Sequence, residues 1–219
     1  MYKQRKDNEY NDMHEKIIEL EIRAEVPAQE REHLKMHLEK MGTFHSHTRR
    51  LSVMCFGNIG KKILDIRVRI TNGECEVVVK SGPFGSHDRT EVAQKINVGD
   101  FLGMVKIFAQ FGFDMKVGER ENFNYVFPDD ITASLVLAGP VSYIELEKMS
   151  SKIEAKRNIE KLRQYADQLG LQLLKSEEEF DELCNRLSEK TDWRFRDTKE
   201  DYAKLEKALN RYFPDKENE

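Results

Sequence analysis

Strict alternation between charged and aliphatic residues constrains the fold of this 219-residue chain more than any other feature. In the first such segment, Glu19, Glu21 and Arg23 fall on one side of an extended strand, because successive side chains of a strand point to opposite faces. The other segments are Asp65–Ile70, Glu76–Lys80 and Tyr143–Glu147. The pattern predicts a sheet with one apolar face and one heavily ionised face.

The order of the charges along these segments indicates where the ionised face lies. Acidic pairs occur in the first and last segments, whereas arginines and lysines dominate the segments between them. An open sheet with its charges in water would show the same alternation. Pairs of glutamates suit a hard divalent cation, however, and rows of basic groups suit phosphate oxygens. The pattern therefore favours a barrel lined with charge.

The intervening sequence predicts an α+β fold, with an antiparallel eight-stranded β-barrel over residues 16–148. Thr71–Glu74 contains Asn-Gly and is a strong hairpin signal. Residues 47–56 and 63–71 are expected to form two strands. Apolar spacing predicts inserted helices at 28–41 and 99–111, and strands near 113–127 and 131–137. After Lys148 the pattern becomes helical, which predicts a helical C-terminal extension over residues 149–219. Residues 1–15 are polar and are expected to be a flexible N-terminus.

Composition excludes several classes of partner. The net charge of −4 opposes a nucleic-acid-coating role. The three cysteines have no metal-type or disulfide-type spacing, which indicates reduced thiols. The sequence shows neither a signal peptide at its N-terminus nor an apolar run of membrane-spanning length. A cytoplasmic protein that binds neither nucleic acid nor membrane is expected.

Taken in order, the charged motifs resemble those of the CYTH family, also called the triphosphate tunnel metalloenzymes. The order is Glu-x-Glu, Arg-x-Arg, a strand that ends in lysine, Arg-x-Glu and a terminal Glu-x-Glu. The resemblance covers roughly residues 16–148. The family includes thiamine triphosphatase, inorganic triphosphatases and class IV adenylyl cyclases.

The resemblance implies a role for each matching residue. The expected ligands of Mg²⁺ or Mn²⁺ are Glu19, Glu21, Glu145 and Glu147. The expected substrate ligands are Arg23, Arg67, Arg69, Lys80, Arg89, Lys116 and Arg120. The expected catalytic residues are Glu19, Glu21, Arg23 and Glu91.

Three positions depart from the family pattern. Arg23 stands where the family usually has a lysine, and a guanidinium does not lose its proton. Gly118 precedes Arg120 where the family often has Lys-x-Arg, and Lys116 is the nearest lysine. The penultimate strand, Ala133–Val136, contains no aspartate.

These observations predict metal-dependent hydrolysis of a triphosphate, either inorganic or organic. A cyclase that makes cyclic AMP from ATP would bind the phosphates with the same residues. A non-catalytic sensor of triphosphate or polyphosphate is favoured by the departures at Arg23 and at the penultimate strand. The expected partner is a small-molecule triphosphate, and the protein is expected to be a monomer or a homodimer.

Overall fold

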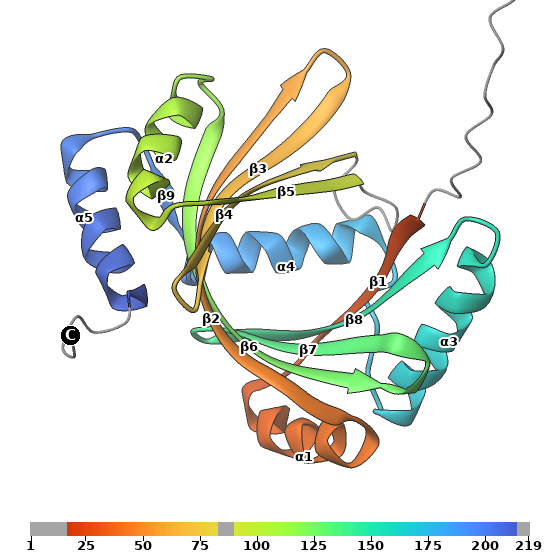
Figure 1. Cartoon of the computed structure of the whole chain (residues 1–219). Coiled ribbons are helices and arrows are strands. Elements are labelled where there is room, and N and C mark those ends of the chain that lie inside the picture. The colour runs from red at the N-terminus through yellow and green to blue at the C-terminus, as the bar shows by residue number, and fades with distance from the viewer. Residues whose placement is uncertain (1–16, 83–89, 214–219) are drawn as a thin grey trace, which may run out of the picture.

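The computed structural model describes residues 17–82 and 90–213 (Figure 1). The predicted flexible N-terminus and Arg89 lie outside these residues. Within them, no helix is both long and apolar enough to cross a membrane.

Within the described residues, eight antiparallel strands form the continuous path of one curled sheet, as the sequence predicts (Figure 1). The strands are β1 (Ile17–Glu25), β2 (Thr43–Ile59), β3 (Lys62–Thr71), β4 (Glu74–Ser81), β5 (Thr90–Ile96), β6 (Asp114–Phe127), β7 (Ile131–Ala138) and β8 (Val141–Ser151). Their order in space is β1-β8-β7-β6-β2-β3-β4-β5. Among the described residues β1 and β5 do not pair with each other, so the curled sheet is open between these two strands.

Five α-helices and four short 3-10 helices complete the described chain. The α-helices are α1 (Arg31–Met41), α2 (Phe101–Ala109), α3 (Ala155–Gln168), α4 (Glu177–Lys190) and α5 (Lys199–Leu209). The 3-10 helices are η1 (Ala28–Glu30), η2 (Val98–Asp100), η3 (Pro128–Asp130) and η4 (Asn210–Tyr212). The helices predicted at 28–41 and 99–111 are therefore confirmed, each with a 3-10 turn at its start.

The convex face of the sheet is covered by helices and holds two apolar clusters. Leu34 and Leu38 of α1 pack with Leu162 and Ala166 of α3 on β1, β6, β7 and β8. The second cluster joins α2 and α5 to β2, β3 and β4 (Figure 1). On β1 every second residue from Ile18 to Ala24 is buried in this way, while the charged residues between them are only half-buried. Burial of the aliphatic face thus directs the charged face to the concave side.

Some boundaries differ from the sequence prediction. The Thr71–Glu74 hairpin is confirmed, with positive φ angles of 47° at Asn72 and 88° at Gly73. Strand β2 begins earlier and ends later than the expected 47–56, because it pairs with β6 from Thr43 onward and with β3 up to Ile59.

The C-terminal extension contains a strand that the sequence did not reveal. Strand β9 (Trp193–Phe195) pairs antiparallel with residues 115–117 of β6. It is only three residues long, too short to show an alternation. The extension thus adds a short strand to the sheet as well as covering part of it.

Candidate functional site

The site lies on the concave face and is assembled from alternate residues of neighbouring strands. In the β1–β8 register, Glu21 lies opposite Glu147 and Arg23 lies opposite Glu145. Residues that face each other across antiparallel strands have Cβ atoms about 5 Å apart. The two Glu-x-Glu segments, far apart in the sequence, therefore form one acidic patch.

Three carboxylates in this patch are close enough to share a cation. Oxygen atoms of Glu21, Glu145 and Glu147 all lie within 4.8 Å of one another. Glu19 lies on the same strand face but is not one of the three, although its charge reaches Glu147. Carboxylate oxygens are the donors that Mg²⁺ and Mn²⁺ prefer, so these three residues fit a hard divalent cation.

The protonation of the patch reflects the crowding of negative charge. Burial and repulsion from Glu145 raise the pKa of Glu21 well above its usual value. Burial, then Glu145 and Glu19, raise the pKa of Glu147 to about 8. Burial also opposes ionisation of Glu145, but the charge of Arg23 and a hydrogen bond with Glu21 hold its pKa low. Without a cation, ionising all three carboxylates together is unfavourable.

Arg23 lies within the acidic patch itself. Its Nε donates to Glu145 Oε1 at 2.8 Å and also forms an ion pair with Glu21. Burial opposes its charge, but the two carboxylates outweigh this and raise the pKa of Arg23. Arg23 thus neutralises part of the acidic charge and stays protonated.

Strands β3, β4 and β5 carry a basic wall in which each cation is fixed by a carboxylate. Arg67 donates through Nε and Nη2 to Asp65, at 2.9 and 2.7 Å, and the Asp65 side chain is 1% exposed. Arg69 pairs with Glu76 at 2.7 Å, and Lys80 pairs with Glu91 at 2.7 Å. Such pairs hold the cationic groups in place while other N–H groups stay available to a ligand.

The basic wall and the acidic patch face each other across the concave space. The charge of Lys80 lowers the pKa of Glu145 and opposes the raised pKa of Glu147. Besides the effects of burial and of Asp65, Tyr143 raises the pKa of Arg67 and the charge of Arg23 lowers it. Groups on β3 and β4 therefore act on groups of β1 and β8 although the strands do not pair, as expected for a curled sheet.

A carboxylate from the C-terminal extension enters this space beside Gly118. Arg120 donates to Asp192 through Nη1 at 2.7 Å and Nη2 at 3.1 Å, and Lys116 lies 3.6 Å from Asp192. A Cβ at position 118 would lie 2.4 Å from Asp192 Oδ1. The glycine that departs from the family pattern thus makes room for Asp192.

Helix α4 crosses the concave side of the sheet (Figure 1). Near its start, the Phe180 ring centroid is 4.8 Å from Arg23 Cζ. Near its end, Ser188 accepts a hydrogen bond from Lys116 at 2.9 Å. Between these points Leu183 and Leu187 are buried against Ala138 and Val141 of the sheet. The helix therefore spans the distance from the acidic patch to β6.

The structure adds three residues to the predicted set. Arg50 on β2 lies directly opposite Arg120. Tyr143 faces the same space, where burial and Glu145 raise its pKa to about 12 although Arg120 and Arg23 oppose the increase. The third is Asp192. Arg50 precedes the strictly alternating Asp65 segment, and Asp192 lies in the helical tail, so neither position belongs to a charged motif.

Two hollows lie along β2, and each is lined partly by charged residues of the concave face. One, of about 420 Å³, is lined by Thr48, Arg50, Thr71, Asn72, Glu74, Cys75, Glu76 and Lys95. The other, of about 230 Å³, is lined by Phe56, Asp114, Met115, Lys116, Ser188, Asp192, Trp193 and Arg194. Thr48 and Phe56 are separated by about 27 Å along the strand at ~3.4 Å per residue.

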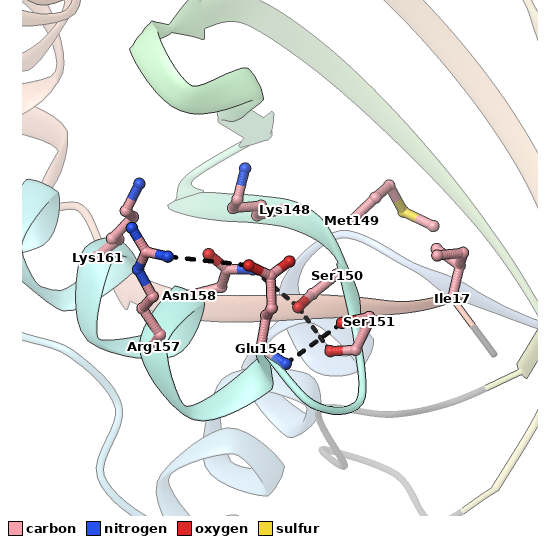
Figure 2. A pocket seen from close by; sticks show the side chains of 9 residues that line it. All are labelled: Ile17, Lys148, Met149, Ser150, Ser151, Glu154, Arg157, Asn158 and Lys161. Carbon is pink, nitrogen blue, oxygen red and sulfur yellow. Dashed lines mark hydrogen bonds and ion pairs between the residues drawn. The ribbon is translucent and has the colours of Figure 1, made fainter. Parts of the chain in front are cut away.

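A third hollow, of about 470 Å³, lies at the ends of β1 and β8 and the start of α3 (Figure 2). Its polar groups are engaged with one another: Asn158 donates to Ser150 at 2.9 Å, and the Glu154 amide donates to Ser151 at 3.3 Å (Figure 2). None of the predicted site residues that the structure describes lines it. This hollow is therefore separate from the charged face.

Comparisons with solved structures show which known fold this is. PH1012 from Pyrococcus horikoshii OT3 is 20% identical, with a TM-score of 0.57 over 71% of this chain and 92% of that chain. PH1819 from the same organism is also 20% identical, with a TM-score of 0.56 over 74% and 97%. A Vibrio parahaemolyticus protein whose name proposes an adenylate cyclase is 16% identical, with a TM-score of 0.55 over 77% and 98%. The chain has the CYTH fold.

Comparisons of the whole sequence do not detect this likeness. No protein-family profile matches the chain, and no curated protein matches it. At these low identities the CYTH fold fixes the architecture only, and the roles of the individual residues on the concave face stay predictions.

Proposed function

We propose that the chain is a triphosphatase that depends on a divalent metal and hydrolyses inorganic tripolyphosphate or an organic triphosphate. The observation that carries this proposal is the pairing of two opposed surfaces. Glu21, Glu145 and Glu147 lie within 4.8 Å of one another on one side, and Lys80 and Arg67 act on that region from the other. A triphosphate bridging a cation and a basic wall needs both surfaces.

The chain's own residues would act by positioning and by charge. Arg67 donates to Asp65, and Arg69 donates to Glu76. These bonds already fix the orientation of both guanidinium groups. Fixed donors stabilise charge that develops on phosphoryl oxygens without reorganising during the reaction. Glu21, Glu145 and Glu147 would hold Mg²⁺ or Mn²⁺, which would supply Lewis-acid neutralisation of phosphate charge.

The proton of the attacking water needs an acceptor other than Arg23. The pKa of Arg23 is raised by Glu21 and Glu145, so its guanidinium keeps its proton at neutral pH. A carboxylate of the patch or an oxygen of the substrate would take the proton instead. We assign Arg23 to charge stabilisation.

A cyclase is the second candidate. The hollow of about 230 Å³ combines the aromatic residue Phe56 with Lys116, whose Nζ lies 5.2 Å from the Phe56 ring centroid. An aromatic group beside a cation suits a purine base. The name of the Vibrio neighbour points to the same activity.

Product analysis separates these functions. The protein is incubated with tripolyphosphate, thiamine triphosphate or ATP, with Mg²⁺, Mn²⁺ or a chelator, and the products are resolved by chromatography. We expect metal-dependent release of orthophosphate and little cyclic AMP from ATP. Cyclic AMP with pyrophosphate as the dominant products would establish the cyclase. Tight binding of triphosphate without turnover would favour a sensor, in which the carboxylates already pair with the arginines.

A further inference from the structure

Arg50 is placed among other cations on the concave face. Its Nε donates to Thr71 Oγ1 at 3.1 Å, and in the β2–β6 register it lies directly opposite Arg120. Like charges that face each other across two strands are destabilising. Arg120 is neutralised by Asp192, but Arg50 forms no ion pair within residues 17–82 and 90–213.

The predicted substrate ligands in the described chain differ from Arg50 in this respect. Each of them has a carboxylate oxygen within ion-pair distance. The pairs are Arg23–Glu145, Arg67–Asp65, Arg69–Glu76, Lys80–Glu91, Lys116–Asp192 and Arg120–Asp192. A carboxylate of the protein thus neutralises each of these cations, whereas no carboxylate of the described residues pairs with Arg50.

Those surroundings make the charge of Arg50 costly. Burial, then the charges of Arg69 and Arg67, lower its pKa from the usual value. Glu145 and Glu76 act in the opposite sense without offsetting the decrease. A guanidinium remains protonated in proteins all the same. A bound anion would remove the repulsion, because it would interact favourably with all three arginines.

The space beside Arg50 can receive such an anion. Arg50 lines the hollow of about 420 Å³ together with Thr48, Thr71 and Lys95. The Oγ1 atom of Thr48 is buried and has no hydrogen-bond partner among the described residues. An unsatisfied buried hydroxyl is uncommon in native structures, and a phosphate oxygen would accept a hydrogen bond from it. The carboxylates of the hollow are already engaged, Glu76 by Arg69 and Glu74 by Lys95.

On the basis of the proposed function, we propose that Arg50 and Thr48 form a further phosphate-binding subsite of the charged face. The subsite binds one phosphate group of a polyphosphate chain whose adjacent phosphate contacts Arg69 and Arg67. It extends the phosphate-binding surface along β2, beyond the predicted residues of β3 and β4. Arg50 is a substrate-binding residue in this arrangement and takes no part in proton transfer.

Calorimetric titration with tripolyphosphate in the presence of a chelator tests the subsite without turnover. Hydrogen bonds to charged groups contribute about 1.5–3 kcal/mol, so Arg50→Gln should raise the Kd about 10- to 150-fold. Arg50→Lys keeps the charge but loses the paired N–H geometry, and its Kd should lie between those of the wild type and Arg50→Gln. The matched control is Arg49→Gln, which removes the same charge from the adjacent exposed residue and should change the Kd by no more than about 2-fold.

Thr48→Val provides an independent test, because it removes only the hydroxyl group. We expect about a 5-fold rise in Kd, and thermal unfolding in ligand-free buffer no lower than that of the wild type, since the unpaired buried hydroxyl is gone. Arg50→Gln should also melt no lower than the wild type without ligand, because repulsion from Arg69 and Arg67 is removed.

The outcomes distinguish this subsite from the proposed function. Wild-type affinity in both Arg50→Gln and Thr48→Val overturns the subsite while leaving the triphosphatase intact. Affinity that depends on Arg50 in a protein that turns over no triphosphate supports the subsite and overturns the triphosphatase. A wild-type protein that binds no tripolyphosphate overturns both.

Discussion

Replacing Glu147 with glutamine should stabilise the metal-free protein while weakening its response to metal. Glu147 is half-buried on β8 beside Glu145 and Glu21, and its pKa is raised to about 8 by burial and by Glu145 and Glu19. Glutamine has the same shape as a protonated glutamate but cannot ionise. The variant therefore avoids the cost that the wild type incurs when this carboxylate loses its proton in a crowded acidic patch.

The magnitude follows from the shift in pKa. A change from 4.5 to about 8 corresponds to about 5 kcal/mol at 1.36 kcal/mol per unit. Glu147 remains in contact with solvent on the concave side, which screens the repulsion, so we expect a gain of about 2–3 kcal/mol. For a chain of this size that gain raises the Tm by about 4–12 °C.

The gain should depend on pH in a defined sense. Because the folded-state pKa of Glu147 is raised, folding is favoured by its proton below the unfolded value of 4.5. That contribution is lost as the pH rises toward about 8. The Tm of Glu147→Gln should therefore match the wild type near pH 4.5 and exceed it most at about pH 8 and above.

Thermal unfolding followed by circular dichroism, in chelator and in excess Mn²⁺, measures both effects. Mn²⁺ should raise the Tm of the wild type and raise that of the variant much less. Glu160→Gln, on the exposed surface of α3, is the matched control and should show neither effect. A variant that melts at or below the wild type in chelator at every pH would refute the reasoning about crowded carboxylates.

Three further substitutions test the rest of the site. Gly118→Ala should cost about 1–3 kcal/mol of unfolding free energy in urea denaturation, because its Cβ would overlap Asp192; unchanged stability would mean that Asp192 moves freely. Arg67→Ala should weaken tripolyphosphate binding by about 2–3 kcal/mol in calorimetry, and unchanged affinity would remove it from the substrate ligands. Asp192→Asn should cost about 1–3 kcal/mol of unfolding free energy, because Arg120 loses its carboxylate partner, and an unaltered urea midpoint would contradict a stabilising role for that ion pair.

The alternation of charged and aliphatic residues allowed the strands of the fold to be predicted from the sequence. Residues 19–23 and 143–147 show period two because one face packs on helices and the other faces the concave space. The Asn72-Gly73 turn could be predicted equally well, since few other residue pairs adopt its positive φ angles. The sequence also placed Glu21, Glu145 and Glu147 on one face correctly, because register in a sheet with one buried face is strongly specified.

The missed parts of the site depend on long-range contacts that leave no local pattern. Asp192 reaches Arg120 across 72 positions of sequence, and its role is visible only once β9 has aligned with β6. Arg50 belongs to a strand whose other inward residues, such as Ser52 and Met54, carry no charge. The absence of a β1–β5 pair among the described residues likewise could not be inferred, because alternation fixes faces and not the neighbours of an edge strand.

The pairing of β9 with β6 has a consequence for the order in which the protein can be completed during synthesis. Residues 115–117 leave the ribosome well before Trp193–Phe195, their partners on that side of the sheet. At about 5–20 residues per second, the roughly 80 intervening residues take about 4–16 s to make. Throughout that interval the nascent chain has an open segment of β6 and an Arg120 that lacks Asp192. A chaperone that binds exposed strand edges would find its target there, and a stop codon placed before residue 192 would make that transient state permanent.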